Sequence, residues 1–401
     1  MQTTTTPKCL LWLAAVMTVW SQSSLAQLPA ASLQLSPLPD GTNLGLRIST
    51  QPGFTYAIEQ SADLAHWLWQ GSLYSDGLTL NWMTSLAQST PRFFRTQSGL
   101  PNTQVVTNYH NWTNTVWLNN GLVEVVVVPN AGRVMQFRFL GDTNGPFWEN
   151  PALYGQNATP TSWNTEGGFG GDKAWPSPQS DWGWPPPSGF DGSTNSCTFS
   201  NGVVTLTTPV DATYQVRTTR VLELAIGQPV MRIRTIFERV SATTLTNKVL
   251  GNWVITQTQE PVRVYVPVPQ ASIFTQGYTQ LGTGLPSQFS NTNRLISFTR
   301  DTVASHKLGF DTGALAWVGT NLALRIDSPR LAGLPQSSYP DGGCNTEVYT
   351  NPGAPYVELE CLGPLAKLPV GARMEFVTTY TLFRRTETDP DTEAHRILGV
   401  P

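Results

Sequence analysis

The chain has 401 residues, of which only 13% are Asp, Glu, Lys or Arg, and its formal net charge is -3. It contains 14 Trp, 34 Gly and 31 Pro, so it has neither the low aromatic content and high charge of a disordered protein nor the composition of a long-helix protein. No basic patch is visible, and nucleic acid is therefore not expected as a partner. The composition favours a folded, turn-rich protein with a largely uncharged polar surface.

Residues 1–26 have the layout of a signal peptide. Lys8 provides a short positive start, residues 9–20 are apolar, and Ser24 and Ala26 are small residues at the cleavage positions. The apolar run is shorter than the ~20 residues that cross a membrane, so no membrane span is expected. A buried first helix is the alternative. The pattern predicts an exported protein, periplasmic or extracellular, that begins near Gln27.

Three cysteines follow the expected cleavage site, namely Cys197, Cys344 and Cys361. Export permits oxidation, so Cys344 and Cys361 could form a disulfide if their strands are adjacent. Three buried thiols are the alternative. The sequence has no CxxC, CxxCH or HExxH motif, so neither a metal site nor a cofactor is predicted.

Residues 32–98 contain short alternating or aromatic runs separated by turn signals, which predicts a small antiparallel β-sandwich. The stretch YAIEQSADLAHW at residues 56–67 and the closing RFFR at residues 92–95 resemble a recurrent module of secreted bacterial proteins. That resemblance implies a fibronectin III-like architecture and an accessory role. A short polar linker follows at residues 98–104.

Residues 105–385 are again rich in strand signals, such as VEVVVVP, PVMRIRTIFERV and RMEFVTTYTLFRR, and no stretch has a clear helical period. A dozen or more strands over this length predict a large all-β sandwich or barrel. Residues 386–401 are expected to be a charged C-terminal tail.

Two segments of this second domain resemble galactose mutarotase-like (aldose 1-epimerase-like) domains. NNGLVEVVVVPNAGRV at residues 119–134 is similar to the start of such domains, and PYVELECLGPLAKLPVG at residues 355–371 is similar to their end. The resemblance implies a many-stranded antiparallel supersandwich and a mono- or oligosaccharide as ligand. It also implies a Glu near the C-terminal end that acts as the catalytic base, and His residues in mid-domain that act as proton donors.

Glu358 and Glu360 are the candidates for the catalytic Glu. They are two residues apart, so on a strand both would point to the same side. One could remove the proton of the anomeric hydroxyl while the other accepts a hydrogen bond from the sugar, or both could lie on a solvated face. No His lies between His110 and His306, and either of these is a candidate for the acid, with His306 preferred.

Residues 167–187, GGFGGDKAWPSPQSDWGWPPP, predict a long loop stiffened by Gly and Pro. Rigid Trp rings can stack on the apolar faces of sugars while polar side chains bind the hydroxyl groups. A loop that is only pinned by buried Trp is the alternative. The residues of this loop that are expected to bind a sugar are Asp172, Lys173, Trp175, Gln179, Trp182 and Trp184.

Arg133 could bind a carboxylate or phosphate group of a sugar, or form a structural ion pair with Glu124 or Asp142. Two main functions and a lesser third follow from these residues. The first is an aldose mutarotase or epimerase-like isomerase that uses Glu358 or Glu360 with His306. The second is a non-catalytic carbohydrate-binding protein on the same fold, and a polysaccharide lyase is a third possibility. The fold alone does not choose among them.

Overall fold

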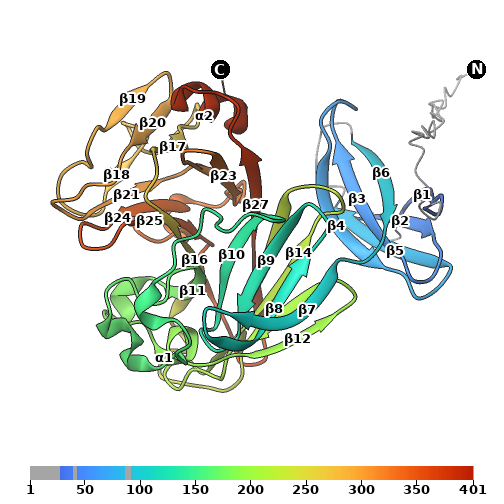
Figure 1. Cartoon of the computed structure of the whole chain (residues 1–401), viewed down its shortest axis with the longest axis horizontal. Coiled ribbons are helices and arrows are strands. Elements are labelled where there is room, and N and C mark those ends of the chain that lie inside the picture. The colour runs from blue at the N-terminus through green and yellow to red at the C-terminus, as the bar shows by residue number, and fades with distance from the viewer. Residues whose placement is uncertain (1–27, 39–42, 86–91, 401) are drawn as a thin grey trace, which may run out of the picture.

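The computed structural model describes residues 28–38, 43–85 and 92–400 (Figure 1). The expected signal peptide lies outside these ranges, so cleavage and export stay predictions. In the described ranges no helix is both long and apolar enough to cross a membrane.

The N-terminal part of the described chain forms two three-stranded antiparallel sheets, drawn in blue in Figure 1. One consists of β1 (Ser32–Pro37), β2 (Asn43–Ser49) and β5 (Thr79–Ser85). The other consists of β4 (Leu68–Tyr74), β3 (Thr55–Ser61) and β6 (Phe93–Gly99). Their apolar faces share a core that includes Leu46, Ile48, Tyr56 and Ile58. The fibronectin III-like relationship stays a prediction.

The first large sheet has eleven strands, all antiparallel to their neighbours. Its main path runs through β18 (Thr279–Gln280), β21 (His306–Phe310), β24 (Thr346–Thr350), β25 (Tyr356–Leu362), β16 (Val249–Gln259), β11 (Asp172–Ser177), β10 (Arg133–Phe139), β9 (Val123–Val128), β8 (Trp112–Asn119) and β7 (Thr103–Tyr109). The short strand β26 (Ala366–Lys367) pairs with β16 off this path.

The second large sheet has ten antiparallel strands. In order they are β12 (Ser196–Ser200), β13 (Val203–Thr207), β14 (Val216–Leu224), β15 (Val230–Arg239), β27 (Arg373–Arg384), β23 (Leu322–Asp327), β22 (Ala314–Val318), β17 (Arg263–Pro267), β20 (Leu295–Phe298) and β19 (Ser290–Thr292). The helices are short: η1 (Pro151–Leu153), η2 (Pro160–Asn164), η3 (Gln179–Asp181), α1 (Ser188–Asp191), η4 (Gln336–Ser338) and α2 (Pro390–Leu398).

The main core lies between the two large sheets. Alternate residues of β25, namely Val357, Leu359 and Cys361, pack into it. Since side chains of a strand alternate between the faces, Glu358 and Glu360 project from the opposite face of the same sheet. The prediction of an all-β fold with a large antiparallel supersandwich is confirmed.

A buried polar bridge joins the two large sheets. Asp172 of β11 forms an ion pair with Arg220 of β14. Its second carboxylate oxygen accepts hydrogen bonds from the hydroxyl groups of Thr256 and Tyr380, each at 2.6 Å. Asp172 is fully buried, so this bridge satisfies polar groups that would otherwise be stranded in the core.

The segment expected to be a charged tail contains α2, which packs Ala394, Ile397 and Leu398 against the outer face of the second large sheet. Its ends carry ordinary helix signals. Asp389 caps the N-terminus, and Gly399 ends the helix in a left-handed conformation.

The three cysteines within the described residues are free thiols. Cys361 points into the core between the large sheets, whereas the Sγ atom of Cys344 lies 3.1 Å from the carbonyl oxygen of Asp341. The two side chains therefore point to different environments, and the disulfide considered for them is not formed.

Replacement of Asp172 by Ala should lower the free energy of unfolding by about 3–5 kcal/mol, because Arg220 would remain buried without a counter-charge. Asp142→Ala is the matched control, since its ion pair with Arg384 lies at the surface and should contribute no more than about 1 kcal/mol. Chemical denaturation of both variants measures the difference. Equal losses would contradict the structural role of the bridge.

Candidate functional site

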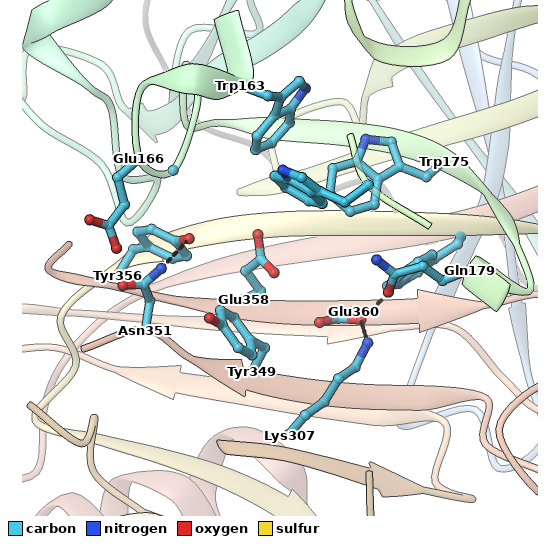
Figure 2. A pocket seen from close by; sticks show the side chains of 13 residues that line it. Trp163, Glu166, Trp175, Gln179, Lys307, Tyr349, Asn351, Tyr356, Glu358 and Glu360 are labelled. Carbon is cyan, nitrogen blue, oxygen red and sulfur yellow. Dashed lines mark hydrogen bonds and ion pairs between the residues drawn. The ribbon is translucent and has the colours of Figure 1, made fainter. Parts of the chain in front are cut away.

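A cavity of about 340 Å³ lies over the face of the 11-stranded sheet that points away from the core, and we call it the first cavity (Figure 2). Its aromatic lining consists of Trp163, Trp175, Trp184, Trp253, Tyr349 and Tyr356. Its polar lining includes Glu166, Gln179, Lys307, Asn351, Glu358 and Glu360. The first cavity thus combines several aromatic rings with three carboxyl groups.

Trp175 is the centre of the aromatic cluster. Its ring meets the rings of Trp163 and Trp253 edge to face, each with centroids 5.3 Å apart. Trp184 packs edge to face on Trp163 at 5.2 Å and is 59% exposed. Trp182 packs on Trp175 from outside the first cavity and donates to the carbonyl oxygen of Pro176. The cluster holds three rings firmly and leaves Trp184 accessible.

The prediction of a long loop over residues 167–187 is wrong for residues 172–177, which form β11 in the middle of the sheet. This strand pairs along its length with β16. Alternation on β11 sends Lys173 and Trp175 to the face that carries the first cavity and Asp172 to the core. Sequence reasoning missed the strand because it is short and contains Pro176 between residues that otherwise suggest a loop.

Glu358 points toward the aromatic cluster in Figure 2, and its Oε1 atom lies 3.2 Å from the Nζ atom of Lys173. Lys173 is almost completely buried and lies 5.1 Å from the ring centroid of Trp175. Burial lowers the pKa of the Lys173 ammonium below its ordinary value, although the charge of Glu358 opposes this shift. Lys173 does not line the first cavity. It lies behind Glu358 and provides this carboxyl group with a counter-charge.

Glu360 belongs to a second buried charge cluster. Lys307 of β21 lies 3.0 Å from Glu360 and 2.7 Å from Glu347 of β24. The indole N–H of Trp253 also donates to Glu360, at 2.8 Å. Glu347 and Glu360 are direct partners across β24 and β25, so two carboxyl groups share one lysine.

Burial raises the pKa of both Glu347 and Glu360 above the ordinary value, and Lys307 opposes the shift in each case. The charge of Glu358 adds to the rise in the pKa of Glu360. For Lys307, burial would lower the pKa, but the two carboxylates outweigh burial and raise it. Sequence reasoning missed Lys307 and Glu347, although the alternation TEVYT at residues 346–350 could have indicated a second acidic strand.

His306, which the sequence suggests as the proton donor, does not line the first cavity. It is adjacent in sequence to Lys307 and therefore projects from the opposite face of β21. Its Nδ1 atom lies 2.8 Å from the carbonyl oxygen of Thr283, and its Nε2 atom lies 3.4 Å from Asp301. The described residues that line the first cavity include no histidine. Within the described ranges there is also no cluster of His, Cys, Asp and Glu that could hold a metal ion.

Arg133 and Asp172 do not line the first cavity either. Arg133 is buried and forms an ion pair with Asp191 at 2.6 Å, rather than with the expected Glu124 or Asp142. The other carboxylate oxygen of Asp191 accepts from the indole N–H of Trp175 at 2.6 Å. Arg133 therefore helps to fix Trp175 from behind, and its charge is not free to bind an anionic group.

Comparisons with protein-family models and with curated proteins find no match, but solved structures do match. The chain is similar to mutarotase-like proteins.

A mutarotase candidate, YeaD from Salmonella typhimurium, is 9% identical, with a TM-score of 0.39 over 71% of this chain and 94% of its own. HI1317 is 8% identical, with a TM-score of 0.39 over 71% of this chain and 100% of its own. The GalM/aldose epimerase homologue from C. elegans is 8% identical, with a TM-score of 0.34 over the same shares. Because these TM-scores are low, the function is inferred from the residues of this chain.

Replacement of Lys307 by Met should lower the free energy of unfolding by about 3–5 kcal/mol, because two buried carboxyl groups lose their shared cation. The loss should be smaller at about pH 5 than at about pH 8. Without Lys307 no shared cation opposes the rise in pKa that burial causes in the two carboxyl groups, so the variant takes up protons on them more readily, and protonation at the lower pH relieves their unpaired charge.

Thermal unfolding at both pH values measures this effect. Lys248→Met is the control, because Lys248 pairs with Asp181 at an exposed position and its loss should change stability by less than about 1 kcal/mol. A loss in Lys307→Met that does not depend on pH would argue against the shared cluster.

Proposed function

We propose that this protein is an exported, sugar-binding isomerase that interconverts the anomers of a neutral aldose in the first cavity. The observation that carries the proposal is the placement of Glu358 and Glu360 side by side on the floor of a tryptophan-lined cavity. Apolar rings with a few convergent polar groups are the usual composition of a small-molecule site. Stacking on the rings and hydrogen bonds to the carboxyl groups suit the mixed surface of a sugar.

Anomer interconversion needs one group that removes a proton and another that delivers one. Glu358 accepts the proton of the anomeric hydroxyl, and that oxygen forms a double bond to the anomeric carbon. The bond from this carbon to the ring oxygen breaks, and the ring oxygen takes a proton from Glu360. Rotation of the open-chain aldehyde and the reverse steps give the other anomer.

The environments of the two carboxyl groups suit these roles. The ammonium group of Lys173 compensates the charge of an ionised Glu358. Burial raises the pKa of Glu360, which favours a carboxyl group that holds a proton for delivery. Pairs of titratable groups with different environments are a common basis for acid and base roles.

Charge favours a neutral sugar over a sugar phosphate. Lys173 and Lys307 are each paired with carboxylates, and Arg133 is paired with Asp191. No described cation at the first cavity is therefore left to bind a phosphate group, while Glu166 adds a further carboxyl group to the lining. The phosphate-binding role considered for Arg133 is not part of the proposal.

Glu358→Gln combined with Glu360→Gln should reduce catalysed mutarotation at least tenfold, since general acid–base groups typically contribute ~10²–10⁴. Polarimetry with freshly dissolved α-D-glucose, α-D-galactose and a wider aldose panel measures the rate. Glu375→Gln, at an exposed position on β27, is the matched control and should leave the rate unchanged. A wild-type rate equal to that of buffer on the whole panel would exclude the activity.

A second function is favoured by the position of His306 outside the first cavity. Without a histidine, the same cavity serves a non-catalytic carbohydrate-binding protein, in which Glu358 and Glu360 only accept hydrogen bonds from sugar hydroxyls. Binding would then depend on the aromatic rings, of which Trp184 is the most exposed.

Trp184→Ala should weaken sugar binding about tenfold and leave thermal stability nearly unchanged, because most of this ring is exposed. Trp182→Ala is the informative comparison: that ring packs behind Trp175, so its loss should reduce stability more than Trp184→Ala does. A glycan array followed by calorimetry measures both. Unchanged affinity in Trp184→Ala would remove this ring from the site.

A further inference from the structure

A second cavity, of about 390 Å³, lies beside the first and plays no part in the proposed proton transfers. Its lining includes His110, Asn144, Trp148, Glu149, Tyr154 and Gln259. Aromatic rings and hydrogen-bonding side chains are therefore combined here as well. None of these six residues lines the first cavity.

Glu149 provides a buried polar group with unused hydrogen-bonding capacity. Its side chain is only 6% exposed, and one carboxyl oxygen accepts from the hydroxyl group of Tyr109 at 2.6 Å. No hydrogen bond of good geometry reaches the other oxygen, Oε2, and Nε2 of His110 is 3.6 Å away. Burial raises the pKa of this carboxyl group, and hydrogen bonding from Gln136 and Tyr154 opposes that larger effect. An unsatisfied buried carboxyl oxygen costs free energy unless a further group binds it.

The turn between β7 and β8 holds His110 at this cavity. His110 and Asn111 have φ values of 44° and 69°, the left-handed pair that a two-residue hairpin turn requires. The imidazole ring stacks on Tyr154 with centroids 4.0 Å apart and an angle of 3° between the planes. His110 and Tyr154 thus form an ordered aromatic wall next to the buried carboxyl group of Glu149.

A pair of contacting aromatic rings joins the linings of the two cavities. Trp148 lines the second cavity, Tyr356 lines the first, and their ring centroids are 4.8 Å apart. Pro355, which directly precedes Tyr356, also lines the second cavity. Gly167 packs closely against both rings, since a Cβ atom there would lie 2.7 Å from Trp148 and 2.9 Å from Tyr356.

We propose that the two cavities are neighbouring subsites for one oligosaccharide, whose reducing-end unit lies in the first cavity and whose next unit crosses the Trp148–Tyr356 pair into the second. This inference rests on the proposed function and adds the substrate class to it. Trp148 and Tyr154 supply stacking faces for the second unit. Glu149, Asn144 and Gln259 supply groups that bind its hydroxyls.

The test is calorimetric titration of the whole protein with glucose, galactose and xylose and with their linear β- and α-linked oligomers of two to four units. In at least one series, affinity should rise at least tenfold from the monosaccharide to the disaccharide or trisaccharide. Trp148→Ala and Glu149→Gln should each reduce that rise to less than threefold and leave the affinity for the monosaccharide within threefold of the wild type. Glu149→Gln keeps the shape of the side chain, so it decides the matter if Trp148→Ala does not fold.

Trp67→Ala is the matched control, because this ring packs on Arg95 in the N-terminal sheets, and it should change neither affinity. Monosaccharide binding without any rise with chain length would overturn the two-subsite inference and leave the proposed function standing. A rise that both variants retain would also overturn it, since another surface would then hold the second unit. If no sugar of any length binds, both the proposed function and this inference fail.

Discussion

The candidate site depends on the pairing of buried charges on one face of a β-sheet. Lys307 lies between Glu347 and Glu360, and Lys173 compensates Glu358. A buried carboxylate without a partner is so costly that it takes up a proton or destabilises the fold. The two lysines therefore allow acidic groups to persist at the bottom of an aromatic cavity.

The alternation of side chains along the strands places the buried charges on one face of this sheet and the apolar core on the other. On β25, residues of one parity form the core between the large sheets, and residues of the other parity form the floor of the first cavity. On β11, Asp172 bridges the two sheets while its neighbour Lys173 supports Glu358. Neighbouring residues thus have unrelated roles, one in stability and one in the site.

Much of this arrangement could be predicted from the sequence. The strand signals gave the all-β class, and the two-residue spacing of Glu358 and Glu360 placed both on one face. The site was harder to predict from the sequence, because it is assembled from strands that are far apart in the chain. Lys307 and Glu347 could not be paired without the order of β21, β24 and β25. His306 is preferred over His110 on the sequence, but alternation along β21 points its side chain away from the first cavity. The caps of α2 were readable from Asp389 and Gly399, whereas β11 was hidden among Pro and Gly residues.

The most direct measurement is a crystal structure of the protein with a bound neutral aldose. A sugar should lie in the first cavity, with its ring against the tryptophan cluster and its anomeric hydroxyl within hydrogen-bonding distance of Glu358 or Glu360. A sugar bound in this cavity with its anomeric carbon directed away from both carboxyl groups would contradict the isomerase. A sugar bound only at another surface would contradict the site itself.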